Sequence, residues 1–197
     1  YVKPRYGYAI DPVFEGLCIA ACDAFDRGLG SIKEIDAVCE KVLGQGVGPF
    51  KALNLTGALP LLDVGAPHYQ DAVMPWFHVP ALVKAQLEKG TPFETATREE
   101  TVDVDEQTAE RISRHMLGAY YMLACDVVDA GLISISDYEE VISLALDMKP
   151  PFSMMNKRGL DEALALCSAF AEANEGARVP QCLADQAAKK APWRVLS

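Results

Sequence analysis

Cysteine and histidine, the residue types that most often carry out chemistry, are few and scattered in this 197-residue chain. The six cysteines lie at positions 18, 22, 39, 125, 167 and 182. They form no C-x-x-C pair, and no histidine stands at a metal-ligand spacing from them. Their neighbours are mostly alanine, leucine and valine. We therefore expect reduced thiols in the core of a cytoplasmic protein, and no metal site.

The three histidines are equally isolated along the sequence. His68 and His78 flank YQDAVMPWF, a segment with the character of a loop, and His115 lies in an apolar run that is typical of a buried helix. None has a carboxylate one helical turn away in a recognisable site. His115 is expected to be structural. The sequence thus predicts no catalytic residue.

The charge balance and the length of the apolar runs argue against two classes of partner. Eighteen basic and 28 acidic residues give a net charge of −10, which disfavours a nucleic-acid backbone as a ligand. The basic pairs Lys157–Arg158 and Lys189–Lys190 are interpreted as solvated helix ends. No apolar run approaches the roughly 18 residues of a membrane span. We expect neither nucleic acid nor a membrane as a partner.

A repeat organises the elements. Residues 22–32, CDAFDRGLGSI, match residues 125–135, CDVVDAGLISI, at an offset of 103. Pro49-Phe50 match Pro151-Phe152 at an offset of 102, and the stretch from Val79 matches that from Val179 at 100. Three matched blocks in one order predict a tandem duplication of a unit of about 100 residues.

Each unit is expected to be helical. Asp11 as a cap and Pro12 in the first turn start a helix that ends at Gly28, and its copy covers 112–130. The S-x-x-[DE] signatures at Ser31 and Ser134 open second helices. A short helix near 50–55 is paired with one at 160–174, and Pro80 and Pro180 lead the closing helices. No segment alternates like a strand.

The predicted fold is all-α, with two related bundles packed together. The first unit covers 1–93, an acidic linker covers 94–108, and the second unit covers 109–197. The first helix of each unit is apolar on nearly every face, so the two should pack against each other. Met116, Tyr120 and Met122 either belong to this core, which we favour, or line a pocket for an acyl chain.

The segment from Gly7 to Gly57, including the Gly-Pro-Phe turn, resembles the C-terminal helical domain of the 3-hydroxyacyl-CoA dehydrogenase family. The segment DAGLISISDYEEVISLALDMKPPF resembles the second copy of that domain, as found in fusions with an enoyl-CoA hydratase. The closing helix of the first unit, with its P-x-L start at Pro80, fits the same family. The resemblance implies a tandem 6-phosphogluconate dehydrogenase C-terminal-like helical fold.

The resemblance also implies an activity, which is NAD-dependent oxidation of 3-hydroxyacyl-CoA in fatty-acid β-oxidation. The family binds NAD in an upstream dinucleotide-binding domain, and the glycines at 44, 46 and 48 do not form its G-x-G-x-x-G fingerprint. We therefore expect no cofactor-binding residue here and no activity from this chain alone. The expected partners are acyl-CoA and the upstream domain. A homodimer stays open, although a second copy within the chain would replace a partner subunit.

Asp11 is the candidate substrate-binding residue, because it stands where the family usually has an asparagine that hydrogen-bonds the substrate. An amide can donate to a carbonyl oxygen, whereas an ionised carboxylate only accepts. The competing interpretation of Asp11 is a simple helix cap. A non-catalytic helical module that binds acyl-CoA or a protein is therefore the alternative function. A dehydrogenase-like fold acting on a different small acid is a third.

Overall fold

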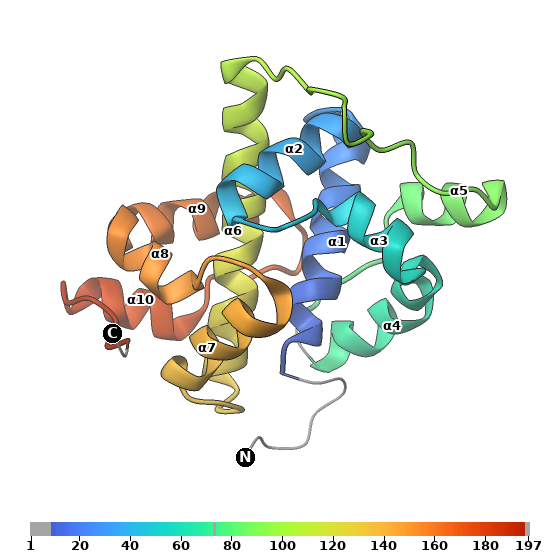
Figure 1. Ribbon diagram of the computed structural model, residues 1–197. Coiled ribbons are helices and arrows are strands. Elements are labelled where there is room, and N and C mark those ends of the chain that lie inside the picture. The colour runs from blue at the N-terminus through green and yellow to red at the C-terminus, as the bar shows by residue number, and fades with distance from the viewer. Residues whose placement is uncertain (1–8, 73, 196–197) are drawn as a thin grey trace.

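The protein is entirely helical over the residues that the computed structural model describes, 9–72 and 74–195 (Figure 1). Ten helices lie in these ranges: α1 Asp11–Asp26, α2 Ile32–Leu43, α3 Pro49–Thr56, α4 Leu59–Ala72, α5 Ala81–Lys89, α6 Glu106–Asp129, α7 Ile135–Leu146, α8 Pro151–Arg158, α9 Leu160–Ala173 and α10 Gln181–Ala188. The all-α prediction is confirmed.

Local capping explains where several helices begin. Ser31 and Glu34 form the predicted capping box of α2, with both reciprocal hydrogen bonds present. Ser134 likewise accepts from the backbone N–H of Asp137 at the start of α7. Helix α6 begins at Glu106, earlier than the predicted position 112 and inside the predicted linker. Its cap is Asp105, whose carboxylate accepts from Thr108 N–H at 2.9 Å.

The five helices of each half follow the same order. The bounds of α2 and α7 differ by 103 residues at both ends, those of α3 and α8 by 102, and those of α4 and α9 by 101. The predicted pairing of the short helix near 50–55 with 160–174 was therefore wrong. Helix α3 corresponds to α8, and α9 corresponds to α4, a helix that proline and glycine residues hid in the sequence.

An asparagine clamp closes each half in the same way. Asn54 donates to Phe93 O at 3.0 Å and accepts from Phe93 N–H at 2.9 Å. Asn156 makes the same two contacts with Trp193, at 3.0 and 2.7 Å. Each clamp also holds an aromatic ring against the phenylalanine of the Pro-Phe turn, at centroid distances of 4.9 Å in the first half and 5.0 Å in the second.

A buried carboxylate caps the third helix of each half. Asp36 on α2 accepts from Phe50 N–H at 2.8 Å and from Lys51 N–H at 3.1 Å, at the start of α3. Glu139 on α7 accepts from Ser153 N–H at 2.9 Å, at the start of α8. These contacts satisfy backbone donors that a helix start leaves unpaired.

The two halves share one core around α6. Helix α1 packs along α6, as predicted, and α2 from the first half crosses it (Figure 1). The approach of α1 is close, because a Cβ on Gly16 would lie 2.7 Å from Leu123 Cδ2. Buried apolar residues of both halves form one continuous cluster. No helix among the described residues is long and apolar enough to cross a membrane.

Candidate functional site

The predicted site residue, Asp11, lies at the start of α1 but does not occupy the N-cap position of this helix. The helix begins at Asp11 itself, with Ile10 at the N-cap position and Pro12 in the first turn. The prediction that Asp11 caps this helix was therefore wrong. Its carboxylate instead lies in the first turn, where the helix dipole favours negative charge.

Glu15 follows Asp11 by one helical turn and forms a carboxylate pair with it. Burial, and to a lesser extent the negative charge of Asp11, raise the pKa of Glu15 to about 7, against a hydrogen bond with the hydroxyl of Tyr69 that lowers it. The Tyr69 hydroxyl donates to Glu15 Oε1 at 3.4 Å. Glu15 was not predicted as a site residue, although its four-residue spacing from Asp11 places both on one helix face.

Helix α4 completes the site from the other side. Gly65 lets α4 approach α1, since a Cβ at this position would lie 2.9 Å from Glu15 Oε2. Tyr69 is almost fully buried and its ring packs against Phe77 at a centroid distance of 5.3 Å. These partners were not predicted, because α4 itself was not predicted.

The pair of Asp11 and Glu15 can donate a hydrogen bond as well as accept one. A carboxyl group with a pKa near neutrality is protonated in a substantial fraction of molecules, and the protonated form can donate a hydrogen bond. The start of α1 therefore offers acceptors at Asp11 and a group at Glu15 that can accept or donate. This arrangement suits a carbonyl-bearing or hydroxyl-bearing ligand.

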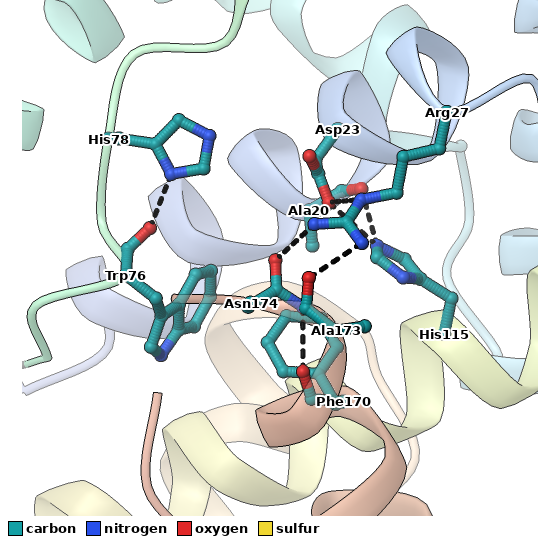
Figure 2. A network of polar contacts seen from close by, with 9 residues as sticks. All are labelled: Ala20, Asp23, Arg27, Trp76, His78, His115, Phe170, Ala173 and Asn174. Atoms are coloured by element: carbon teal, nitrogen blue, oxygen red, sulfur yellow. Dashed lines mark hydrogen bonds and ion pairs between the residues drawn. The ribbon is translucent and has the colours of Figure 1, made fainter. Parts of the chain in front are cut away.

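A second polar cluster joins the two halves and is structural (Figure 2). Arg27, the C-cap residue of α1, donates to Asp23 Oδ2 at 2.6 Å, to Ala173 O at 2.8 Å and to Asn174 Oδ1 at 2.8 Å. Asn174 also donates to Phe170 O at 2.8 Å, at the end of α9. The Arg27 side chain thus satisfies the C-terminal end of α9 across the seam between the halves.

His115 lies in this cluster, in the structural role that was predicted. Its Nε2 lies 3.0 Å from Ala20 O and 3.7 Å from Asp23 Oδ2. Because a carbonyl only accepts, Nε2 carries the hydrogen of this bond. Burial lowers the pKa of His115, although the Asp23 carboxylate and the bond to Ala20 act in the opposite direction. The imidazole is therefore a neutral link between α6 and α1.

The other two histidines lie elsewhere. His68 was expected next to a loop but lies within α4, and its side chain is exposed. His78 is also exposed, and its Nδ1 lies 2.8 Å from Trp76 O (Figure 2). The structure does not bring the histidines together.

The cysteines are free thiols, and the prediction of core thiols is confirmed for five of them, while Cys182 is only partly buried. Burial raises the pKa of Cys18, Cys22, Cys39, Cys125 and Cys167, which makes these thiols unreactive. Within 9–72 and 74–195, no group of histidine, cysteine and carboxylate side chains could hold a metal ion.

The methionine and tyrosine stripe on α6 belongs to the core. Met116, Tyr120 and Met122 have no solvent exposure, and the Tyr120 hydroxyl donates to Lys149 O at 2.8 Å. The structure therefore favours the packing interpretation over a pocket for an acyl chain.

Comparison with known proteins identifies the fold. The crystal structure of 3-hydroxybutyryl-CoA dehydrogenase from Escherichia coli K12 superposes with a TM-score of 0.74, at 12% sequence identity. The superposition covers 96% of this chain and 61% of that chain, so this chain spans about three fifths of the length of that structure. No family model and no curated protein matches the sequence. The chain thus shares its helical fold with part of that dehydrogenase.

Proposed function

We propose that this chain is the C-terminal helical part of a 3-hydroxyacyl-CoA dehydrogenase-like protein of fatty-acid or acyl-CoA degradation. The observation that carries this proposal is the superposition with 3-hydroxybutyryl-CoA dehydrogenase over 96% of this chain. That structure extends beyond the shared part, which accords with a dinucleotide-binding domain that holds NAD outside this chain. Free thiols throughout the described residues accord with the cytoplasm as its location.

The start of α1 is proposed to form one wall of the acyl-CoA cleft. Asp11 occupies the position of the family's asparagine, and Glu15 with Tyr69 supplies the polar group that Asp11 lacks when ionised. In this role the protonated Glu15 donates to the substrate carbonyl oxygen, while the ionised form only accepts. The hydride transfer itself belongs to the NAD-bearing domain.

The tandem duplication is also part of the proposal, with units at 1–93 and 109–197 joined by residues 94–108. The repeated asparagine clamps and the repeated carboxylate caps support it, because they conserve contacts and not only residue types. The seam between α1 and α6 then takes the place of a subunit interface. A homodimer would need a surface other than this seam.

The experiment joins this chain to the region encoded immediately upstream of Tyr1 and follows NADH formation with 3-hydroxybutyryl-CoA. We expect hydride transfer, and an upstream sequence with G-x-G-x-x-G after a strand. In the same protein Asp11→Asn should strengthen acyl-CoA binding by about threefold to tenfold. The substitution removes a negative charge, and the new amide can donate a hydrogen bond to the substrate. Asp63→Asn on the exposed face of α4 is the matched control.

Two results would favour the alternative, a non-catalytic module that binds acyl-CoA or a protein. The first is binding of acyl-CoA without any NADH formation by the joined protein. The second is an Asp11→Asn variant that behaves like the Asp63→Asn control. The carboxylate pair in place of the family's asparagine is the observation that keeps this alternative in view.

A further inference from the structure

A cavity of about 480 Å³ lies where the end of α2 meets the second half of the chain. Its walls come from α2, α6, the segment between α7 and α8, and the helices α8 and α9. The lining residues are Val42, Tyr121, Lys149, Met154, Lys157, Arg158 and Glu162. This cavity is unrelated to the carboxylate pair at the start of α1.

The cavity is positive in a strongly negative protein. Three of its seven lining side chains are cations and one is a carboxylate, in a chain whose net charge is −10. Lys149 is fixed in place, because its ammonium donates to Lys41 O at 2.8 Å and to Val42 O at 3.2 Å. Arg158 pairs with Glu162 at 2.7 Å. Lys157 has no hydrogen-bond or ion-pair partner among the described residues.

The buried wall of the cavity carries a hydroxyl group beside one of the cations. Tyr121 has no solvent exposure, and no described atom meets its hydroxyl with hydrogen-bond geometry. A buried hydroxyl without a partner is costly, and its presence commonly marks a missing ligand or water. Burial raises the pKa of Tyr121, while the charge of the Arg158 guanidinium and its approach to the hydroxyl as a donor lower it. Arg158 is therefore the one described side chain that approaches this hydroxyl, outside the geometry of a regular hydrogen bond.

The first half of the chain serves as an internal comparison. At the offsets that align α3 with α8 and the ends of α1 and α6, Lys157 corresponds to Leu55, Arg158 to Thr56 and Tyr121 to Cys18. Helix α3, which corresponds to α8, therefore ends without a cation although it occupies the same place in the first half. The fold does not need the basic pair at this helix end, so helix capping alone does not account for it.

We propose that this cavity binds the phosphate group of a small organic phosphate. Three cations with one carboxylate leave an excess of two positive charges, which suits a doubly charged phosphate better than a single carboxylate. Lys157 and Arg158 donate to the phosphate oxygens from the open side, and the Tyr121 hydroxyl donates from the floor. Val42 and Met154 offer apolar contact to the organic part of the ligand.

The test is calorimetric titration of the 197-residue chain with adenosine monophosphate, inorganic phosphate and adenosine. We expect saturable binding of adenosine monophosphate with a dissociation constant of about 1 mM or below, and weakening as salt is raised. Inorganic phosphate should compete, and adenosine should bind far more weakly. This ranking separates recognition of phosphate from recognition of the ring.

Three substitutions sharpen the result. Lys157→Gln should weaken the binding of adenosine monophosphate by about tenfold, because it removes a cation that donates to the phosphate. Tyr121→Phe removes one neutral donor and should weaken binding by a smaller factor. Tyr121→Phe keeps the ring and removes only a hydroxyl that makes no regular hydrogen bond, so it should fold normally. Lys189→Gln, in the other basic pair, is the control and should leave the affinity unchanged.

Absence of saturable binding, or equal affinity for adenosine and adenosine monophosphate, would overturn the proposal. So would a Lys157→Gln variant that binds as tightly as the Lys189→Gln control. An Asp11→Asn variant should bind adenosine monophosphate normally. The outcome here is therefore independent of the acyl-CoA proposal.

Discussion

At the scale of single residues, the half-buried Glu15 and the buried imidazole of His115 give the stability of this protein opposite dependences on pH. Glu15 has its pKa raised and His115 has its pKa lowered, in both cases with burial as the largest cause. A carboxylic acid is easier to bury neutral, and so is an imidazole. Each group thus disfavours folding on the side of its pKa where its charged form would prevail.

Glu15→Gln is expected to stabilise the protein at alkaline pH. The pKa of Glu15 rises from 4.5 to about 7 on folding, so the folded state holds more protons between these values and stability falls as pH rises through them. The variant should gain about 1 kcal/mol at pH 8, discounted for partial exposure, and nothing near pH 4. Urea unfolding across this range measures it. A gain no larger than that of exposed Glu88→Gln would contradict the prediction.

His115→Gln is expected to flatten the acid side of the same profile. Because the pKa of His115 is lowered from 6.5 on folding, the unfolded state binds more protons below that pH, and wild-type stability falls as the solution is acidified. Glutamine can still donate to Ala20 O but does not titrate. His78→Gln, at an exposed position, should leave the slope unchanged. Parallel profiles for wild type and His115→Gln would count against this account.

At the scale of elements, the asparagine clamps fix the closing segment of each half to its third helix. Asn54→Ala and Asn156→Ala each remove two hydrogen bonds, including the one that the backbone N–H of Phe93 or Trp193 donates to the asparagine. Phe93 O keeps the bond that it accepts from Thr95 N–H at 3.0 Å. Each should lower the free energy of unfolding by about 2 kcal/mol, and by similar amounts. Chemical denaturation measures both. Values near that of exposed Gln107→Ala would show that the clamps carry little stability.

Helix boundaries were predictable where side chains cap the backbone locally. The S-x-x-[DE] signatures of α2 and α7 and the prolines before α5 and α10 placed those helices correctly. Helix α4 was missed because Pro60, Gly65 and Pro67 argue against a helix in isolation. Its contacts with α1 and α5 outweigh those local preferences, and such contacts are not visible in the sequence.

The part of the candidate site that lies on α1 could be predicted from the sequence, and the part on α4 could not. The position of Asp11 followed from the resemblance, and the Asp11–Glu15 pair follows from helical periodicity. Gly65 and Tyr69 come from α4, fifty residues away, so they required the tertiary structure. The cavity proposed to bind phosphate also required the tertiary structure, because Lys149 and Tyr121 meet the end of α2 there. From the sequence, the pair Lys157–Arg158 was interpreted only as a solvated helix end.

At the scale of the whole molecule, the two five-helix halves share one core. The helix α6 belongs to the second half but is packed by α1 and α2 of the first, and the buried apolar residues form one cluster. Arg27 and Lys149 add polar contacts that cross the same seam. Removing either half would expose a surface that the other half now covers, so we expect cooperative unfolding.

The two tryptophans allow this coupling to be measured, because Trp76 lies in the first half and Trp193 in the second, both buried. Trp193→Phe leaves Trp76 as the only tryptophan fluorophore, and Trp76→Phe leaves Trp193. Gly48→Ala is a lesion confined to the first half, since its Cβ would lie 2.5 Å from Asp36 Cα. Overpacking of this kind costs about 1 to 3 kcal/mol. In a shared core, Gly48→Ala should lower the denaturation midpoint seen by Trp193 as much as that seen by Trp76. A midpoint at Trp193 that stays fixed would show instead that the second half folds by itself.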